Sequence, residues 1–227
     1  WLTRRLPSGK CGCWGFYGRR AGEDVGAVYG AVPYLLQRQI YIDMLEAGKH
    51  LMGEKPVGID QAANREILAA GRRHPELLVR CASEFPYYPA CQMLVDWVRR
   101  GEAGRILEVN AGLNHSSDMN PDKPINWKRV VAMNGEYGCM GDLGIHTEHV
   151  PFRLGWQPRT VYSRLCDYIT ERPDGKGGTA PCETWDNATL MCEMAAPGGA
   201  RFPMTLEMKR MKPGATNTWY LEVYGMN

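Results

Sequence analysis

The stretch "VGAVYGAVPYLLQRQIYIDMLEAGKHLMGEKP", residues 25–56, decides the fold of this chain. It opens with a short apolar run that ends at Pro33, as a buried strand of a parallel sheet does. Apolar side chains spaced three or four residues apart then predict a helix that ends at Gly48. A second apolar run follows and ends at Pro56. The stretch therefore predicts a strand, a helix and a second strand.

The residues after Pro56 continue this alternation. Residues 60–74 have the spacing of a helix with Asp60 as its N-cap, and residues 76–83 read as a third strand. Strands joined by helices at this spacing are typical of a parallel sheet with crossover connections. We therefore expect residues 25–86 to be a partial Rossmann domain, the remnant of a doubly wound parallel sheet.

The pattern changes after residue 84. A helix is predicted at 89–100, a strand at 104–115 and, beyond a long polar loop, a helix within "MGDLGIHTEHVPFRLGW", residues 140–156. Long alternating runs then favour a large, mostly antiparallel open sheet covered by helices on one face. These runs are residues 159–170, 187–196, 200–210 and 218–225. The glycine- and proline-rich residues 172–183 are predicted to form a surface loop. The expected fold class is α/β plus α+β, with residues 87–227 as the α+β domain.

Composition excludes several classes of protein. The chain has 227 residues, 44% of them hydrophobic and 23% charged, with a net charge of +2, which suits a soluble globular protein. So small a charge argues against a dedicated nucleic-acid binder, and no run of about 18 apolar residues is present that could span a membrane. The eight cysteines include no C-x-x-C pair, so we expect reduced, mostly buried thiols and a cytoplasmic protein. Residues 1–24 lack periodicity, and we expect an irregular arm that is disordered or foreign to the fold.

The first candidate for chemistry is "GEKP", residues 53–56. Ligands of open parallel sheets bind beyond the carboxyl ends of the strands, which is where Glu54 and Lys55 would lie. A lysine ammonium there can hydrogen-bond a substrate hydroxyl or stabilise a developing oxyanion. The alternative is that Lys55 is a solvated charge at a strand end.

The second candidate is the helix of residues 140–156. Asp142, His146 and His149 follow one another at intervals of four and three residues, so they share one helical face. Asp142 and His149 would lie about 10 Å apart along the axis, too far to bind one metal ion, and we predict no metal site. An aspartate one turn before a histidine can orient the imidazole for acid–base chemistry. The alternative is a packed, hydrogen-bonded core histidine.

Taken in order, these segments resemble the Gfo/Idh/MocA family of nicotinamide-dependent sugar and cyclitol oxidoreductases. The resemblance runs from about residue 25 to the C-terminus, and "EAGKHLMGEKP" and "GDLGIH" are its most specific parts. It implies an N-terminal Rossmann domain and a C-terminal open-sheet domain for substrate binding and oligomerisation, with the substrate between them. It implies that Lys55 hydrogen-bonds the reacting hydroxyl, that His146 is the general acid/base, and that Asp142 orients His146 or binds a sugar hydroxyl.

The resemblance also implies a set of binding residues. NAD or NADP is the implied cofactor, with its nicotinamide near the loop after the first strand and its ribose near Glu54. Besides Glu54 and Lys55, the cofactor-binding candidates are Ala31, Pro33 and Tyr34. The substrate-binding candidates are Trp127, Lys128, Tyr137 and His149. The face of Trp127 suits the apolar C–H face of a sugar, although a core tryptophan is the alternative.

The sequence departs from the family at its beginning. The family's G-x-G-x-x-G phosphate-binding turn is absent, and 24 residues precede the first predicted strand where the family has two strand–helix units. The C-terminal end also stops early by this comparison. We therefore expect an incomplete oxidoreductase whose cofactor binding is weakened or lost.

The resulting hypothesis is an NAD(P)-dependent dehydrogenase that moves a hydride between the cofactor and a hydroxyl of a sugar, cyclitol or related polyol. Three rivals stay open: an NAD-dependent glycosidase of the same fold, a non-catalytic structural or assembly protein that keeps the open sheet as an interface, and a metal protein. Open sheets cover their faces by pairing, so we expect a homo-oligomer without a nucleic-acid or membrane partner.

Overall fold

The computed structural model describes residues 25–227, so the predicted arm at residues 1–24 lies outside the described part of the chain. The chain divides into two compact units. Among the described residues, the first unit contains residues 25–82 together with Ala132–Gly135, and the second contains Ser83–Val131 and Glu136–Asn227. Each unit has its own apolar core.

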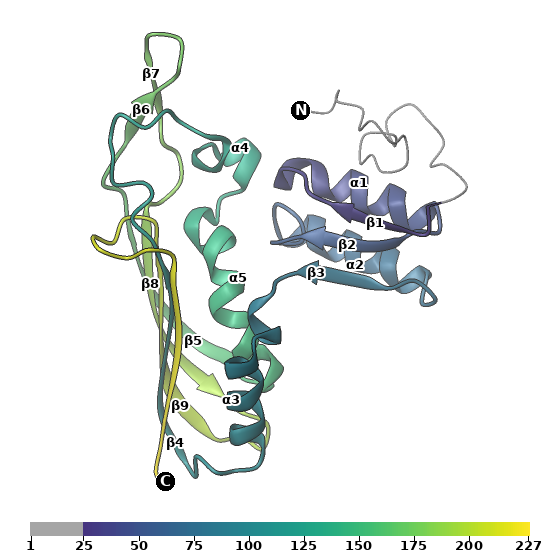
Figure 1. The fold of residues 1–227 in the computed structure, drawn as a ribbon, viewed down its shortest axis with the longest axis vertical. Helices are drawn as coiled ribbons and strands as arrows, with labels where there is room; N and C mark the ends of the chain where they lie inside the picture. Colours follow the sequence, from purple (N-terminus) through teal and green to yellow (C-terminus); the bar gives the residue numbers. More distant parts are fainter. Residues whose placement is uncertain (1–24) are drawn as a thin grey trace. The chain divides into compact units, whose positions relative to one another are not determined.

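The first unit is a three-stranded parallel sheet with two helices packed against it (Figure 1). Strands β1 (Ala27–Gly30), β2 (His50–Glu54) and β3 (Val79–Ala82) lie side by side in that order, and helices α1 (Tyr34–Glu46) and α2 (Gln61–Arg73) connect them. The predicted alternation of strands and helices is confirmed. Asp60 caps α2 as predicted, because its carboxylate accepts a 2.7 Å hydrogen bond from the Ala63 backbone N–H.

Tyr41 of α1 fixes the carboxyl ends of β1 and β2. Gly30 and Gly53 are paired across these two strands, and a Cβ atom added at either glycine would lie 2.4 or 2.6 Å from the Tyr41 ring. The Tyr41 hydroxyl donates a 2.7 Å hydrogen bond to the Gly30 carbonyl. A side chain at position 53 would displace this fully buried ring, so the packing requires a glycine directly before Glu54.

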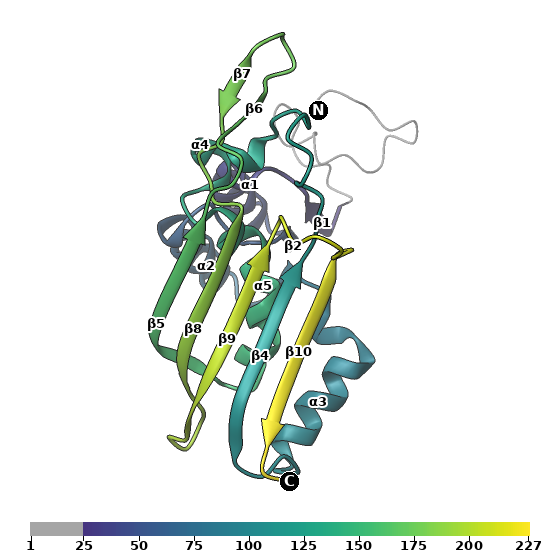
Figure 2. The same cartoon turned by 90° about the vertical axis from the view of Figure 1, so that its left-hand side faces the viewer.

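The second unit is built on a five-stranded sheet in the order β10-β4-β9-β8-β5. Neighbouring strands are antiparallel except β4 and β9, which are parallel. The helices α3 (Pro89–Arg99) and α5 (Gly138–Arg153) lie on one face of this sheet, and the other face is open (Figure 2). The strands are β4 (Ile106–Asn114), β5 (Gln157–Cys166), β8 (Asn187–Ala195), β9 (Arg201–Lys209) and β10 (Thr218–Gly225). The expected mostly antiparallel open sheet is confirmed.

Short helical segments connect these elements. They are η1 (Phe85–Tyr87), η2 (Trp127–Arg129) and α4 (Val131–Asn134). Among the described residues, no helix combines the length and apolar character needed to cross a membrane.

The prediction of a surface loop at residues 172–183 was wrong. Two short strands, β6 (Glu171–Pro173) and β7 (Thr179–Pro181), pair antiparallel there. The Asp174 carboxylate closes their turn by accepting hydrogen bonds from the Lys176 and Gly178 backbone N–H groups, at 2.7 and 3.0 Å. Strands of three residues are too short to produce a detectable alternation, so the glycines of the turn dominated the pattern.

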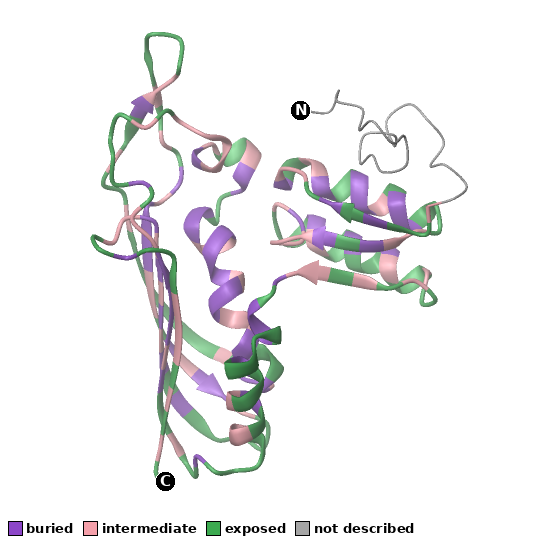
Figure 3. Cartoon of the chain, in the orientation of Figure 1, coloured by how far each residue is buried: buried purple, intermediate pink, exposed green. Residues whose placement is uncertain are grey.

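The core of the second unit lies between the sheet and its helices. Alternate residues of β9 are buried and the residues between them are not, which gives this strand the banded colouring of Figure 3. The buried members are Phe202, Met204, Leu206 and Met208. They pack with apolar residues of α5 such as Leu143 and Val150.

Glu148 of α5 is a carboxyl group placed among these apolar side chains. Its Oε2 atom is buried without a hydrogen-bond partner among the described residues. Burial raises the pKa of Glu148 to about 7, because a carboxylate loses its hydration there. Cys192 on β8 lies close enough for the Glu148 charge to add to the effect of burial in raising the pKa of that thiol. Glu148 is therefore protonated in the folded chain at pH values where the unfolded chain ionises it.

We expect the Glu148→Gln variant to gain stability relative to the wild type as pH rises. A folded-state pKa above the unfolded value of about 4.5 lowers the free energy of unfolding as pH rises from about 4.5 to about 7. Urea unfolding followed by circular dichroism gives the free energy of unfolding of the variant and of the wild type at pH 5 and at pH 8. The difference between the two proteins should change by about 2 kcal/mol between these pH values, a figure that is reduced to allow for partial exposure of Glu148. The exposed control Glu136→Gln should show no such change. A difference for Glu148→Gln that stays constant with pH would contradict this account.

Candidate functional site

In the first unit, the segment after β2 is held by a fully buried glutamine. The Gln37 side-chain amide donates to the Glu54 carbonyl at 3.2 Å, and its oxygen accepts from the Gly58 N–H at 2.7 Å. The Glu54 carboxylate accepts a hydrogen bond from the Tyr29 hydroxyl and one of 3.2 Å from the Lys55 N–H. Both the backbone and the carboxylate of Glu54 are therefore fixed at the carboxyl end of the sheet.

The start of α1 lies at the same edge of the parallel sheet. This follows from the pairing of Gly30 with Gly53, which aligns the ends of β1 and β2. Pro33 precedes the helix and its carbonyl accepts a 2.9 Å hydrogen bond from the Leu36 N–H. Ala31 is exposed, whereas Tyr34 is buried in the unit. The structure thus brings the five cofactor candidates predicted from the sequence to one edge of the sheet.

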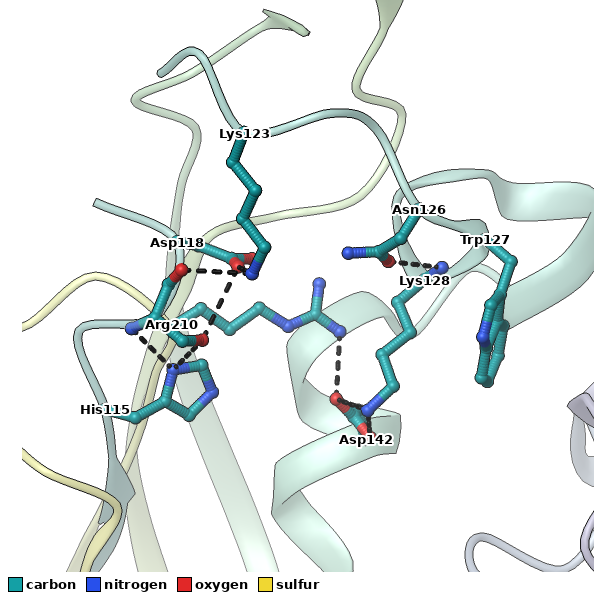
Figure 4. Close-up of a pocket in the computed structure, with 9 residues that line it drawn as sticks. His115, Asp118, Lys123, Asn126, Trp127, Lys128, Asp142 and Arg210 are labelled. Carbon is teal, nitrogen blue, oxygen red and sulfur yellow. Dashed lines mark hydrogen bonds and ion pairs between the residues drawn. The ribbon is translucent and has the colours of Figure 1, made fainter. Parts of the chain in front are cut away.

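The second unit contains a pocket of about 220 Å³. It is formed by the residues after β4, the loop leading to η2, the first turns of α5 and the residue after β9 (Figure 4). Its lining residues are His115, Ser117, Asp118, Lys123, Asn126, Trp127, Lys128, Asp142 and Arg210. Among the residues predicted from the sequence, Trp127, Lys128 and Asp142 line this pocket.

Asp142 is the buried acid of the pocket, with 2% of its surface exposed. The Lys128 ammonium lies 2.9 Å from both carboxylate oxygens, and the Arg210 guanidinium lies 3.3 Å from Oδ2 (Figure 4). Two cations from distant segments therefore share one carboxylate. The sequence identified Asp142 and Lys128 separately but gave no indication that they are bonded to each other.

A second acid, Asp118, lies on the opposite wall and was not identified from the sequence. The Lys123 ammonium is 2.7 Å from its carboxylate, and the buried Arg129 guanidinium is 3.7 Å from it. Burial favours the neutral form of Asp118, but the hydrogen bond from Lys123 and the charges of Lys123, Arg129 and Arg210 outweigh burial and lower its pKa. Asp118 is therefore an ionised carboxylate that is already paired.

Arg129 continues this network behind the pocket. Its guanidinium forms an ion pair with Asp186, and both side chains are almost fully buried. Asp186 also accepts hydrogen bonds from the backbone N–H groups of Tyr168 and Ile169, at 2.6 and 3.0 Å. The ion pair therefore ties η2 to the start of β8 and to the segment after β5.

His115, the residue after β4, lines the pocket as a neutral imidazole. Its Nδ1 accepts from the Ser117 backbone N–H at 3.3 Å, so the proton of the neutral ring is on Nε2. Burial lowers the pKa of His115, more than the nearby carboxylates raise it. His115 therefore presents an N–H donor without adding charge. Its position at the end of a predicted strand is the signal in the sequence that could have identified it.

Arg172 of β6 holds the loop that carries Asp118 and Lys123. It is 2% exposed, and its guanidinium donates to the carbonyls of Asp118 at 2.6 Å, Asn120 at 2.7 Å and Lys123 at 3.3 Å. A guanidinium with five donors can bind several carbonyls of one loop at once, which the ammonium of lysine does less well. The hairpin that the sequence failed to predict therefore positions one wall of the pocket.

The remaining sequence candidates lie outside this lining. His146 is 7% exposed, and the centroid of its ring lies 4.8 Å from the centroid of the Phe85 ring in an edge-on arrangement. Its backbone carbonyl accepts a 2.9 Å hydrogen bond from the Trp219 indole. His149 is half-buried, and burial together with the charge of Arg153 lowers its pKa. Tyr137 is 40% exposed and directly precedes α5. Within the described residues, no group of three or more potential metal ligands is present.

Comparison with known proteins gives the following relatives. No family model matches the chain. Levoglucosan dehydrogenase from Pseudarthrobacter phenanthrenivorans is 26% identical over 155 residues, which are 68% of this chain and 39% of the relative. An uncharacterised oxidoreductase from Synechocystis is 26% identical over 207 residues, which are 90% of this chain and 54% of the relative. A solved structure of levoglucosan dehydrogenase in complex with NADH and levoglucosan is 25% identical, with a TM-score of 0.80 over 91% of this chain and 53% of that one.

These relatives are oxidoreductases of the Gfo/Idh/MocA type, and the chain is similar to them in sequence and fold. The fold inferred from the sequence resemblance is therefore confirmed. The chain matches 39% and 54% of the lengths of these two curated relatives. The Lys128–Asp142–Arg210 cluster described above lies in the open-sheet unit of this Gfo/Idh/MocA fold.

We expect Arg172→Met to loosen the loop of residues 118–123. The substitution leaves three carbonyls without the donor that they have now, which should lower the free energy of unfolding by about 3 kcal/mol. Hydrogen exchange should accelerate by about tenfold or more at the loop amides and less in the sheet. Arg172→Lys should recover part of the protection, and the exposed control Arg164→Met on β5 should change neither quantity. Unchanged hydrogen exchange in the loop of Arg172→Met would show that the hydrogen bonds from Arg172 do not hold this loop.

Proposed function

We propose that this chain is part of an NAD(P)-dependent dehydrogenase that moves a hydride between the cofactor and a hydroxyl of a sugar, cyclitol or related polyol. The observation that carries the proposal is the match, across 91% of the chain, to a levoglucosan dehydrogenase solved with NADH and levoglucosan. The curated levoglucosan dehydrogenase supports it by sequence. The polar pocket beside α5 supports it independently, because its many hydrogen-bonding groups suit a polyhydroxylated ligand.

The edge of the parallel sheet suits the nicotinamide and ribose part of the cofactor. Glu54 offers a carboxylate fixed by Tyr29, which can accept hydrogen bonds from ribose hydroxyls, and Ala31, Pro33 and Tyr34 offer a surface beside it. When bound, the nicotinamide supplies the hydride acceptor or donor.

The proposed chemistry divides between two polar side chains. The reacting hydroxyl loses its proton while its carbon loses a hydride, so the alcohol becomes a carbonyl. Lys55 hydrogen-bonds the hydroxyl oxygen and favours its deprotonated form, and His146 accepts the proton. Asp142 positions groups that bind the substrate, through its contacts with Lys128 and Arg210. Trp127, Lys128, Tyr137 and His149 are the proposed substrate contacts.

The two parts of the sequence have different proposed roles. Residues 25–86 are the remnant of the dinucleotide-binding domain, and residues 87–227 bind substrate and other copies of the chain. We also propose a cytoplasmic location on the strength of the cysteine pattern, and the six cysteines of the described region are free thiols.

Cofactor-linked turnover tests the proposed function. We expect the chain to reduce NAD or NADP with at least one member of a panel that contains the neutral polyols levoglucosan and myo-inositol and the sugar acid D-glucuronate, measured by nicotinamide absorbance. Lys55→Met and His146→Asn should each lower kcat by about 10²- to 10⁴-fold, because each removes a side chain that assists the same proton transfer. The double variant should be little worse than the poorer single variant.

The control for this experiment is Lys176→Met, which removes an exposed lysine of the β6–β7 turn and should leave turnover unchanged. Turnover that survives both Lys55→Met and His146→Asn would overturn the assignment of these residues. Absence of cofactor-linked turnover with every polyol in the panel would overturn the proposed function for this chain.

The open face of the five-stranded sheet is the proposed oligomer interface. Strand register places Tyr162 and Met191 opposite each other on this face, with Tyr224 on the same face of β10. Their exposed fractions are 66%, 57% and 49%. Large apolar side chains exposed on one sheet face favour association with a second copy.

We expect sedimentation velocity to give about twice the 25.5 kDa mass of one chain. Tyr162→Glu combined with Met191→Glu should give single chains, because it places two charges on the proposed interface. Met93→Glu changes a methionine on α3 that is even more exposed than Met191 and should keep the assembly intact. A wild-type chain that sediments as a single copy at all concentrations would refute the sheet-face assembly.

A further inference from the structure

The two carboxylates of the pocket are already engaged by cations. Asp142 is paired with Lys128 and Arg210, and Asp118 is paired with Lys123 and Arg129. A neutral sugar needs acceptors for its hydroxyl protons as well as donors for its oxygens. These two acids are therefore poorly placed to serve as free acceptors for an incoming ligand.

Donors are in excess in the same pocket. Arg210 is 2% exposed and has five N–H donors, yet its two side-chain hydrogen bonds are long, at 3.3 Å to Asp142 and 3.5 Å to the Thr184 hydroxyl. The Asn126 oxygen accepts from the Lys128 N–H at 2.9 Å, which leaves its NH₂ group as a donor toward the pocket (Figure 4). His115 adds the N–H of its neutral ring. A ligand rich in acceptor oxygens would satisfy these groups.

The charges of the lining residues do not cancel. Lys123, Lys128 and Arg210 contribute three positive charges against two negative charges from Asp118 and Asp142, which leaves one positive charge. A single carboxylate neutralises this excess, whereas a phosphate, with a charge of about −1.5 to −2, exceeds it. The pocket volume of about 220 Å³ lies below the range of about 300–1,000 Å³ for whole-ligand sites, so it suits one end of a ligand.

We infer that this pocket binds the carboxylate of a sugar acid, so that the substrate is an anionic sugar rather than a neutral one. The inference rests on the proposed function for its assignment to a substrate. Arg210 and Lys123 are the side chains best suited to bind this carboxylate, because each pairs with an acid and still has an N–H donor for a ligand. Trp127 in the lining offers a face for the sugar ring beside that carboxylate.

Titration calorimetry of the purified chain tests this inference without cofactor or turnover. The probes are D-glucuronate, D-glucose and D-glucose 6-phosphate, which share a ring and differ in charge. We expect glucuronate to bind about tenfold more tightly than glucose, because one charge-assisted hydrogen bond contributes about that factor. We also expect glucuronate to bind more tightly than glucose 6-phosphate. Added salt should weaken glucuronate binding more than glucose binding.

Two substitutions should shift glucuronate affinity in opposite directions. Lys123→Gln removes the excess positive charge and should weaken glucuronate binding by about tenfold. Asp118→Asn keeps the side-chain shape, adds one unit of positive charge to the lining and should strengthen binding by about threefold or more. Arg201→Gln removes a positive charge from an exposed ion pair with Glu193 and should leave binding unchanged. Circular dichroism melting confirms that each variant is folded.

The outcomes separate this inference from the proposed function. Equal binding of glucose and glucuronate, or no opposite shift between Lys123→Gln and Asp118→Asn, overturns the carboxylate subsite. Tighter binding of glucose 6-phosphate than of glucuronate overturns the choice of carboxylate and identifies a dianion. A glucuronate preference with the expected shifts, in a chain without cofactor-linked turnover, supports the subsite and removes only the oxidoreductase assignment.

Discussion

The buried arginines of the open-sheet unit impose the constraint on which the candidate site depends. Arg129, Arg172 and Arg210 are among the largest fully buried side chains of the described chain. A buried ion loses its hydration at a cost of several kcal/mol, which must be offset by close partners. Arg129 meets this requirement with Asp186 and Asp118. Arg172 binds three loop carbonyls, and Arg210 binds Asp142 and Thr184. Of these partners, Asp118, Lys123 and Asp142 line the pocket, and the others lie behind its walls.

This constraint explains why segments far apart in the sequence converge at one end of the sheet. Arg210 directly follows β9, and its backbone N–H donates to the Asp186 carbonyl at 3.1 Å. Asp186 in turn binds Arg129 of η2. Removing one member leaves an unpaired charge in a dry environment, so the cluster tolerates loss of a single partner poorly. In a pocket supported in this way, the lining loops are anchored to packed helices and strands.

Local signals in the sequence predicted most of the fold. The run that ends at Pro33, the cap at Asp60 and the alternation in residues 200–210 each depend on neighbours a few residues apart, and the structure confirms them. The site was predicted less completely, because its bonds join distant segments. Lys128 and Asp142 are 14 residues apart and Arg210 is 68 residues from Asp142. Such pairs depend on strand register and on the hairpin at Arg172, and no local pattern specifies either.

The structure also changes what the Asp142–His146 spacing means. From sequence, the spacing suggested that the carboxylate acts directly on the imidazole one turn later. In the folded chain, Lys128 and Arg210 bind Asp142 and thereby anchor the first half of α5 to η2 and to the end of β9. The turn that carries His146 is held separately, by the Trp219 indole on its carbonyl and by the Phe85 ring against its imidazole. Helix α5 is therefore fixed at two points, and the contacts of Asp142 help to position His146 through the helix backbone.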